Sequence, residues 1–287
     1  MRRWLPILLA LLLLPAFPAR AAALKAATWN LEWLTARPAG DPALPGDVRP
    51  KRATDIARLA AYAAQMNADV IGFQEVDGAR MAARIFPPGR YAIHMTRDDV
   101  VQRVGIAIRR GIAFTAHPDL ALAPPGSRLR DGADITLHLA SGKLRVLAVH
   151  LKADCHFSRL RGSRPACRVL RRQTRILAGW IRARAREGTP FLILGDFNRW
   201  FDRRNGRRDG LWRRLLAAAP LARATQGYAS PCWGGERFID HILAGGAARG
   251  WMRSASLRVL VFAEHGRAWK ERLSDHCPVS VRFRIPP

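Results

Sequence analysis

The chain has 287 residues, 49% of them hydrophobic, so it is long enough for one large domain or two small ones. Its formal net charge of +26 comes almost entirely from arginine, because only five of its 48 basic residues are lysine. Such a field attracts polyanions such as nucleic acid, acidic lipid surfaces or anionic glycans, unless it reflects a general enrichment in arginine. No segment after residue 23 is long and apolar enough to be a transmembrane helix, which excludes a protein with several membrane spans.

The N-terminal segment, residues 1–23, has the features of a secretory signal peptide. Arg2 and Arg3 precede an apolar run that is too short to span a bilayer comfortably, and overlapping small-x-small triplets follow it. We expect this segment to be removed and the mature chain, 24–287, to be exported to the periplasm or out of the cell. A short uncleaved anchor is the alternative.

Hydrophobic patterns predict alternating strands and helices along the mature chain. In chain order these are a strand at 24–33, a helix at 52–68, strands at 68–76, 104–110, 134–140 and 143–152, a helix at 167–187, a strand at 191–198, a helix at 211–219, and strands at 237–244 and 276–285. Strands outnumber helices, and turns join many neighbours. This pattern favours an α/β domain with two sheets packed face to face and helices outside.

Polar side chains recur where these apolar runs end or begin. They are Asn30, Glu75, His150, Asp196, Asn198, Asp240, Asp275 and His276. In α/β sheets such strand ends meet at one rim and build sites there. Residues two apart in an extended segment point to the same face, so Asp196 and Asn198 can face one ligand.

The residue types at this rim indicate a chemistry. Carboxylate and amide oxygens suit Mg²⁺ or Mn²⁺, and two histidines can serve as general base and general acid near neutral pH. The chain has no G-x-S-x-G nucleophile elbow, no G-x-x-x-x-G-K-[ST] loop and no zinc-type Cys/His spacing. The predicted reaction is therefore attack of water on phosphorus, assisted by a metal and histidine.

Four cysteines in an exported chain predict two disulfides. Three connectivities are possible for Cys155, Cys167, Cys232 and Cys277. Since Cys155 and Cys167 bracket a short arginine-rich segment, we favour Cys155–Cys167 with Cys232–Cys277. Free thiols are the alternative.

Six short motifs in one order resemble the endonuclease/exonuclease/phosphatase superfamily, which includes deoxyribonuclease I and exonuclease III. They are TWNLEW, IGFQEV, VHLKADC, ILGDFN, FIDHIL and SDHCPV, and they cover nearly all of the mature chain, from about residue 26 to 283. The resemblance implies one catalytic domain over 24–287 with a four-layer α/β sandwich, in which two mixed sheets lie between helices. It also implies Mg²⁺-dependent cleavage of phosphoester bonds.

The resemblance also implies that four residues bind the metal, the attacking water or the phosphate. Glu75 would bind the metal, with Asn30 beside it. Asp196 and Asn198 would orient the attacking water and hold the scissile phosphate, since an amide N–H can donate to a phosphoryl oxygen without adding negative charge.

The remaining matched residues would move protons or support the metal. His276 would be a general base oriented by Asp240, and Asp275 would bind the metal or support a ligand. His150 would be a general acid. Its carboxylate partner stays open, because either aspartate of the pair at 98–99 is a candidate.

Two basic segments, 156–172 and 199–214, flank the predicted site and favour a nucleic-acid substrate. In the second segment, Arg199, Arg203 and Arg204 are the predicted substrate-binding residues, together with Asn198. Solvated arginine-rich loops are the alternative.

The predicted function is an exported, monomeric, metal-dependent DNA endonuclease of low sequence specificity. The alternative on the same scaffold is a lipid or small-molecule phosphodiesterase, sphingomyelinase-like or acting on phosphoinositides. A third hypothesis, a non-catalytic basic protein that binds DNA, predicts decay of the site, whereas every matched position here retains a workable side chain.

Overall fold

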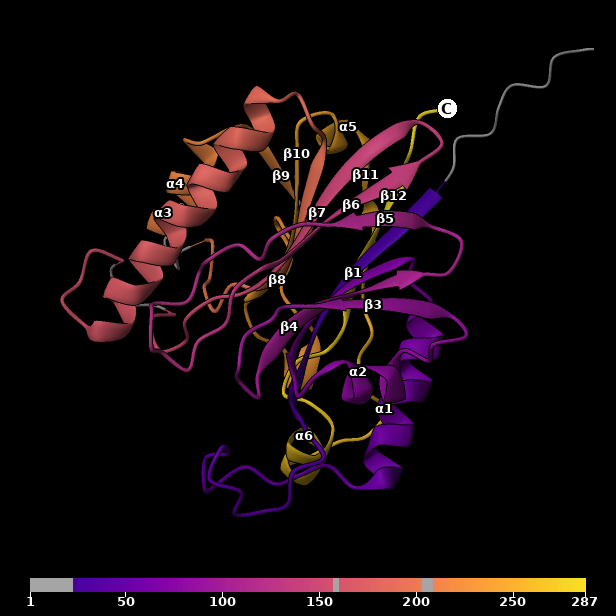
Figure 1. Ribbon diagram of the computed structural model, residues 1–287, viewed down its shortest axis with the longest axis vertical. Helices are drawn as coiled ribbons and strands as arrows, with labels where there is room; N and C mark the ends of the chain where they lie inside the picture. Colours follow the sequence, from indigo (N-terminus) through magenta and orange to yellow (C-terminus); the bar gives the residue numbers. More distant parts are fainter. Residues whose placement is uncertain (1–22, 157–159, 203–208) are drawn as a thin grey trace, which may run out of the picture.

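The computed structural model describes residues 23–156, 160–202 and 209–287, so the predicted signal peptide up to residue 22 lies outside the described residues. Two six-stranded sheets form the centre of the protein (Figure 1). In spatial order, sheet A contains β11 (Met252–Val259), β12 (Val279–Arg284), β1 (Ala23–Leu34), β2 (Val70–Val76), β4 (Arg103–Arg109) and β3 (Tyr91–Met95). Sheet B contains β5 (Ala113–Ala116), β6 (Ala133–Leu139), β7 (Gly142–His150), β8 (Phe191–Asp196), β10 (Asp240–Gly245) and β9 (Leu221–Arg223).

Both sheets are mixed. The pairs β1–β2 and β7–β8 are parallel, and the other neighbours are antiparallel. Helices α1 (Ala53–Met66) and α2 (Ala79–Ile85) cover sheet A, and α3 (Pro165–Arg186) and α4 (Gly210–Leu216) cover sheet B (Figure 1). Short helices α5 (Ala248–Trp251) and α6 (Arg267–Arg272) and a 3-10 turn, Cys232–Gly234, complete the described elements. The predicted sandwich of two mixed sheets between helices is confirmed.

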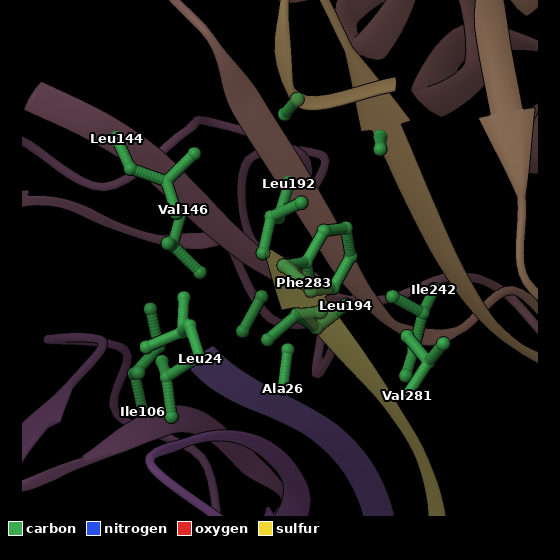
Figure 2. Close-up of a cluster of buried hydrophobic side chains, with 14 of the residues drawn as sticks. Leu24, Ala26, Ile106, Leu144, Val146, Leu192, Leu194, Ile242, Val281 and Phe283 are labelled. Carbon is green, nitrogen blue, oxygen red and sulfur yellow. The ribbon is translucent and has the colours of Figure 1, made fainter. Parts of the chain in front are cut away.

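The inner faces of the two sheets pack directly on each other. Leu24, Ile106 and Phe283 of sheet A meet Leu144 and Leu192 of sheet B in one buried cluster (Figure 2). Separate apolar clusters fill the spaces under α1 and α2 and under α3 and α4. With both faces of its sheet covered, β8 is buried at every residue, which explains its continuous apolar sequence.

The glycine before Asp196 has a steric reason. A Cβ atom on Gly195 would lie 2.1 Å from the carbonyl oxygen of Val149 in β7. Only glycine therefore allows β8 to run this close to β7. The same register sets His150 at the end of β7 opposite Asp196, and pairs Asp196 with Asp240 at the start of β10.

The predicted strands and helices correspond to observed elements whose ends differ by a few residues. The largest shifts are three residues. The strands predicted from 237 and 276 begin at Asp240 and Val279, and the helix predicted to end at 219 ends at Leu216. Strands β3, β5, β9 and β11 and helices α2, α5 and α6 were not predicted. The strands among them lie toward sheet edges, and β5 and β11 are mostly exposed, so they lack the apolar alternation on which the prediction depends.

Both predicted disulfides are confirmed. Cys155 is bonded to Cys167, and Cys232 is bonded to Cys277. Cys155 is five residues after His150, and Cys277 directly follows His276. Each disulfide therefore fixes a segment that leads away from one histidine of the rim. Over the part of the chain that the structure describes, no helix combines the length and apolarity that crossing a membrane requires.

Candidate active site

Four polar side chains surround one carboxylate oxygen, Asp196 Oδ2, at the rim of the two sheets. The amides of Asn30 and Asn198 each donate from Nδ2 to this oxygen at 3.2 Å. The Nε2 atoms of His150 and His276 lie 3.4 and 3.7 Å from it. Asn30 comes from sheet A and Asp196 from sheet B, so the site spans both sheets.

Asn198 is held by its own backbone as well as by its side chain. Its backbone N–H donates to Asp196 Oδ1 at 2.7 Å, and its Nδ2 also donates to the carbonyl of Leu151 at 3.1 Å. Its φ of 49° lies in the left-handed region, as does the φ of 63° at Glu75. Non-glycine residues other than asparagine adopt this conformation infrequently, so the backbone at Glu75 is the less common case, and such residues cluster at functional sites.

Glu75 lies on the sheet A side of Asp196. Its Oε1 accepts from Asn30 Nδ2 at 3.0 Å, and its Oε2 accepts from the backbone of Trp33 at 3.2 Å and from Gln102. His150 Nε2 is 3.7 Å from Glu75 Oε1. Glu75 is therefore oriented toward the same space as Asp196.

His276 and Asp240 form a hydrogen-bonded pair on the other side of Asp196. His276 Nδ1 is 2.7 Å from Asp240 Oδ2, and its Nε2 is 3.6 Å from Asp275 Oδ1. Burial lowers the pKa of His276, but Asp240, Asp275 and Asp196 act against it and raise the pKa well above its usual value. Asp240 thus orients the ring and leaves Nε2 directed toward Asp196.

The pKa of His150 shifts in the opposite direction, although its Nε2 also faces Asp196 and Glu75. Burial and the nearby charges of Arg130, His276 and Lys152 lower the pKa of His150 well below its usual value. Its Nδ1 has no hydrogen-bond partner among the described residues, so neither Asp98 nor Asp99 serves as its carboxylate partner. A neutral imidazole can still donate an N–H hydrogen bond.

Arg130 and Gln102 belong to this site and were not predicted. The Arg130 guanidinium is buried, donates from Nη1 to Gln102 Oε1 at 3.2 Å, and has no described partner at Nε. It lies close enough to Glu75 and Asp196 to interact with both charges. Arg130 stands in a Pro/Gly-rich segment without a strand or helix pattern, and only its burial beside Gln102 shows its place.

The predicted substrate contact at Arg199 is wrong. Its side chain is 1% exposed and forms an ion pair with Asp209, Nη2 to Oδ2, at 2.7 Å. Nη1 donates to the carbonyl of Cys155. Arg199 therefore ties three chain segments together beneath the surface. Arg203 and Arg204 lie outside the described residues.

The carboxylates of the site fit a divalent cation. Burial and the Asp240 charge raise the pKa of Asp196 to about 7, although the nearby His276 acts in the opposite direction. A cation beside this oxygen would relieve the free-energy cost of burying its charge. Asp196, Asp240 and His276 offer ligand atoms within 4.8 Å of one another. Because His276 Nδ1 already bonds Asp240, we favour the Glu75 and Asn30 side of Asp196 for the ion.

His241, the residue after Asp240, anchors β10 as a neutral ring. Its Nδ1 is 2.7 Å from Thr225 Oγ1, and its Nε2 is 3.2 Å from the carbonyl oxygen of Arg199. Burial and the charge of Arg223 lower the pKa of His241 to about 3. The histidine in the unfolded chain has a pKa near 6.5 and therefore binds a proton below that pH. In the folded protein the same ring stays neutral there.

We expect this difference to make the protein less stable in mild acid. The contribution of neutral His241 to the free energy of unfolding is complete above about pH 6.5 and is lost as the pH falls. The loss amounts to about 2 kcal/mol between roughly pH 7 and 5. Denaturant unfolding of the wild type and of His241→Gln across this range measures it. The variant should show the shallower dependence, and equal slopes for both proteins would refute the assignment.

Similar structures share the fold at low sequence identity. A 3'-5' exonuclease, NExo, from Neisseria meningitidis is 17% identical, with a TM-score of 0.60, over 91% of this chain and 99% of that chain. D. rerio TDP2 complexed with a single-strand DNA product is 16% identical, with a TM-score of 0.59, over the same shares of the two chains. An endonuclease/exonuclease/phosphatase from Beutenbergia cavernae is 20% identical, with a TM-score of 0.56, over 93% and 72%.

No curated protein matches the sequence. The Endonuclease/Exonuclease/phosphatase family matches it over residues 27–276, a range that begins in β1 and ends at His276. This range contains every residue of the site described above, from both sheets. The chain therefore belongs to the endonuclease/exonuclease/phosphatase family, whose members hydrolyse phosphoester bonds.

Proposed function

We propose that this protein is an exported, metal-dependent phosphodiesterase that cleaves DNA internally with little sequence preference. The observation that carries the proposal is the convergence of two histidines and two amides on Asp196, with Glu75 alongside. Such a site offers a cation position, hydrogen-bond donors for a phosphate and a base for water. The two disulfides support an oxidising, exported location.

Glu75 and Asp196, with Asn30 beside them, would hold the ion, and Mg²⁺ is the expected ion, with Mn²⁺ as a substitute. Asp275 has a side chain that is 44% exposed and lies 3.6 Å from His276 Nε2, so we give it a supporting role through His276. When bound, the ion would neutralise phosphate charge and polarise a phosphoryl oxygen.

His276 would take the proton from the attacking water once a cation beside Asp196 offsets part of the negative charge that raises the pKa of this ring. Asp240 accepts the hydrogen bond from Nδ1, which fixes the tautomer and stabilises the positive ring that forms. Nε2 is then directed at the space beside Asp196. Neutral His150 and the amide of Asn198 would donate hydrogen bonds to phosphate oxygens.

Arg130 would add a fixed positive charge to the phosphate site. We expect Arg130→Gln to lower kcat/KM for a phosphodiester by about 100-fold, because one preorganised charged donor is lost near the developing negative charge. Arg130→Lys keeps the charge without the planar donor array and should recover part of this loss. Steady-state kinetics, with thermal unfolding as the check on folding, measure both variants. Full activity in Arg130→Gln would remove this residue from the phosphate site.

DNA is the favoured substrate for two reasons. TDP2 and NExo, which share the fold, have been solved with DNA products. The net charge of the chain also attracts a polyanion. The direct test is conversion of supercoiled plasmid to open circles by the mature protein in Mg²⁺, in Mn²⁺ and in excess chelator.

Open circles that form with metal and not with chelator would support an endonuclease. If the folded protein leaves the plasmid intact but hydrolyses sphingomyelin or phosphoinositide vesicles, the substrate is a lipid and the DNA assignment is wrong. Plasmid nicking that persists equally in chelator would contradict the metal requirement.

A further inference from the structure

The outer face of α3 carries a row of arginines that the proposed reaction does not use. We name the exposed members the arginine stripe: Arg164, Arg168, Arg175, Arg182 and Arg186. They recur at intervals of four or seven residues, so they lie along one face of the helix. The opposite face buries Leu170, Leu177 and Ile181 against sheet B.

This stripe has no acidic counterpart within its helix. Glu187, at the C-terminal end, is the one acid between residues 165 and 187, and it pairs with Arg184, which is outside the stripe. None of the five stripe arginines forms an ion pair with a carboxylate in the described parts of the chain. Their charges therefore face solvent without neutralisation.

The arrangement costs the helix stability. Like charges four residues apart, as in Arg164 with Arg168 and Arg182 with Arg186, repel each other by a few tenths of a kcal/mol per pair. The first turn of α3 contains no acid, and its N-cap residue, Arg164, makes no side-chain cap, so cations adjoin the positive end of the helix dipole. A local cost of this kind without local compensation is typical of a functional surface.

A general enrichment in arginine does not explain the stripe. Helix α1 covers the other sheet, and its exposed positions are mainly alanine, with Thr54, Gln65 and one arginine, Arg58, besides the exposed Arg52 at its N-cap. Arg58 is paired with Glu264 at 3.5 Å. In the same chain, then, one outer helix is nearly uncharged on its exposed face and the other is strongly cationic.

We propose that the arginine stripe is a second nucleic-acid contact that holds the backbone of a long DNA substrate away from the active site. This proposal rests on the proposed function, because it assigns the stripe to the same substrate. Arginine guanidinium groups pair with phosphates and carry no sequence preference, which suits an enzyme of low specificity. The 22 residues of α3 extend over about 33 Å, close to one turn of a DNA duplex.

The position of α3 separates this contact from the catalytic rim. Gln173, on the inner face of α3, accepts a hydrogen bond from the backbone of Lys152, two residues after His150, at 2.8 Å. The helix thus adjoins the rim through its buried side, and it lies at the edge of the protein (Figure 1). The stripe residues are exposed on its other face. A substrate small enough to occupy only the rim does not reach the stripe, whereas a long polyanion can bind both.

The test compares two triple variants with the same change of charge. The stripe variant is Arg168→Gln/Arg175→Gln/Arg182→Gln. The matched control is Arg253→Gln/Arg282→Gln/Arg284→Gln, three exposed arginines of β11 and β12 in sheet A. Each triple is made in the full mature chain, and its thermal unfolding is compared with the wild type.

Two quantities are measured for each protein. Binding of a duplex of about three helical turns is titrated against salt in the His276→Ala background. Hydrolysis of bis-p-nitrophenyl phosphate is measured in the active background. The stripe variant should bind the duplex roughly tenfold to 100-fold more weakly, with a slope of log Kobs against log salt that is shallower by about 2.7. Its hydrolysis of the small diester should be unchanged.

The control variant should keep most of its duplex affinity. Equal losses in both triples would show that overall charge, and not the stripe, holds DNA, and would overturn the proposal. Unchanged duplex binding in the stripe variant, with lost binding to phosphatidylglycerol vesicles, would make the stripe a membrane contact and also overturn it. Failure of the proposed nuclease function would give a different result. The wild type would then hydrolyse no plasmid, whereas duplex binding in the His276→Ala background would still be measurable.

Discussion

Replacing His276 by alanine should lower kcat for phosphodiester hydrolysis by about 10²- to 10⁴-fold, the usual contribution of a positioned acid or base. His276 Nε2 is directed at the space beside Asp196, and Nδ1 is fixed by Asp240 at 2.7 Å. Loss of the ring removes the proton acceptor and leaves Asp240 buried without this partner. Duplex binding should persist, since the basic surface remains.

Asp240→Asn tests how the ring is positioned. The amide keeps the shape of the carboxylate but cannot stabilise the positive imidazole, so it should lower kcat by a smaller factor and move the pH profile to lower pH. Rates are measured across the pH range with the small diester, which avoids effects on DNA binding. A His276→Ala enzyme that retains the wild-type kcat would exclude this residue as the base.

Replacing Asp196 by asparagine should be at least as damaging, with a loss of about 10³-fold or more. Its Oδ2 accepts from Asn30 and Asn198 and faces both histidines. An amide nitrogen at this place would oppose two amide donors and would remove the negative charge that favours a cation. Geometry and charge are therefore lost together.

The matched control for this change is Asp154→Asn. Asp154 has a side chain that is 76% exposed, and among the described residues it pairs only with the nearby Lys152 at the surface. It should keep the wild-type rate, because exposed ion pairs contribute little. Mn²⁺ binding, followed by calorimetry in both variants, reports on the ion separately from the rate. Normal Mn²⁺ affinity in Asp196→Asn would contradict the place we give the ion.

The sequence predicts most of the rim because its residues follow strong local patterns. Asp196 and Asn198 stand at the end of a continuous apolar run, and the register of the parallel pair β7–β8 brings His150 opposite Asp196. The same alternation that fixes a strand also fixes where its polar end lies. The disulfide pairing was predictable because four cysteines allow only three connectivities and Cys155 and Cys167 bracket a short segment.

Other features depend on contacts between distant segments and leave no local pattern. Arg199 stands in an arginine-rich run and looks exposed, yet its partner Asp209, ten residues later, draws it into the interior. Arg130 is recruited to the site by Gln102, Glu75 and Asp196, which come from other strands or loops. Burial of a charged side chain next to opposite charges is decided by tertiary packing, and a single segment does not record it.

The measurement that tests the central claim most directly is cleavage of supercoiled plasmid in ¹⁸O-labelled water with Mg²⁺, followed by mass analysis of the product ends. The account predicts metal-dependent open circles whose new phosphate termini carry ¹⁸O, because water activated beside Asp196 and His276 attacks phosphorus. Product ends without label would show that another bond is broken or another nucleophile is used. Absence of cleavage by the folded, metal-loaded protein would equally contradict the account.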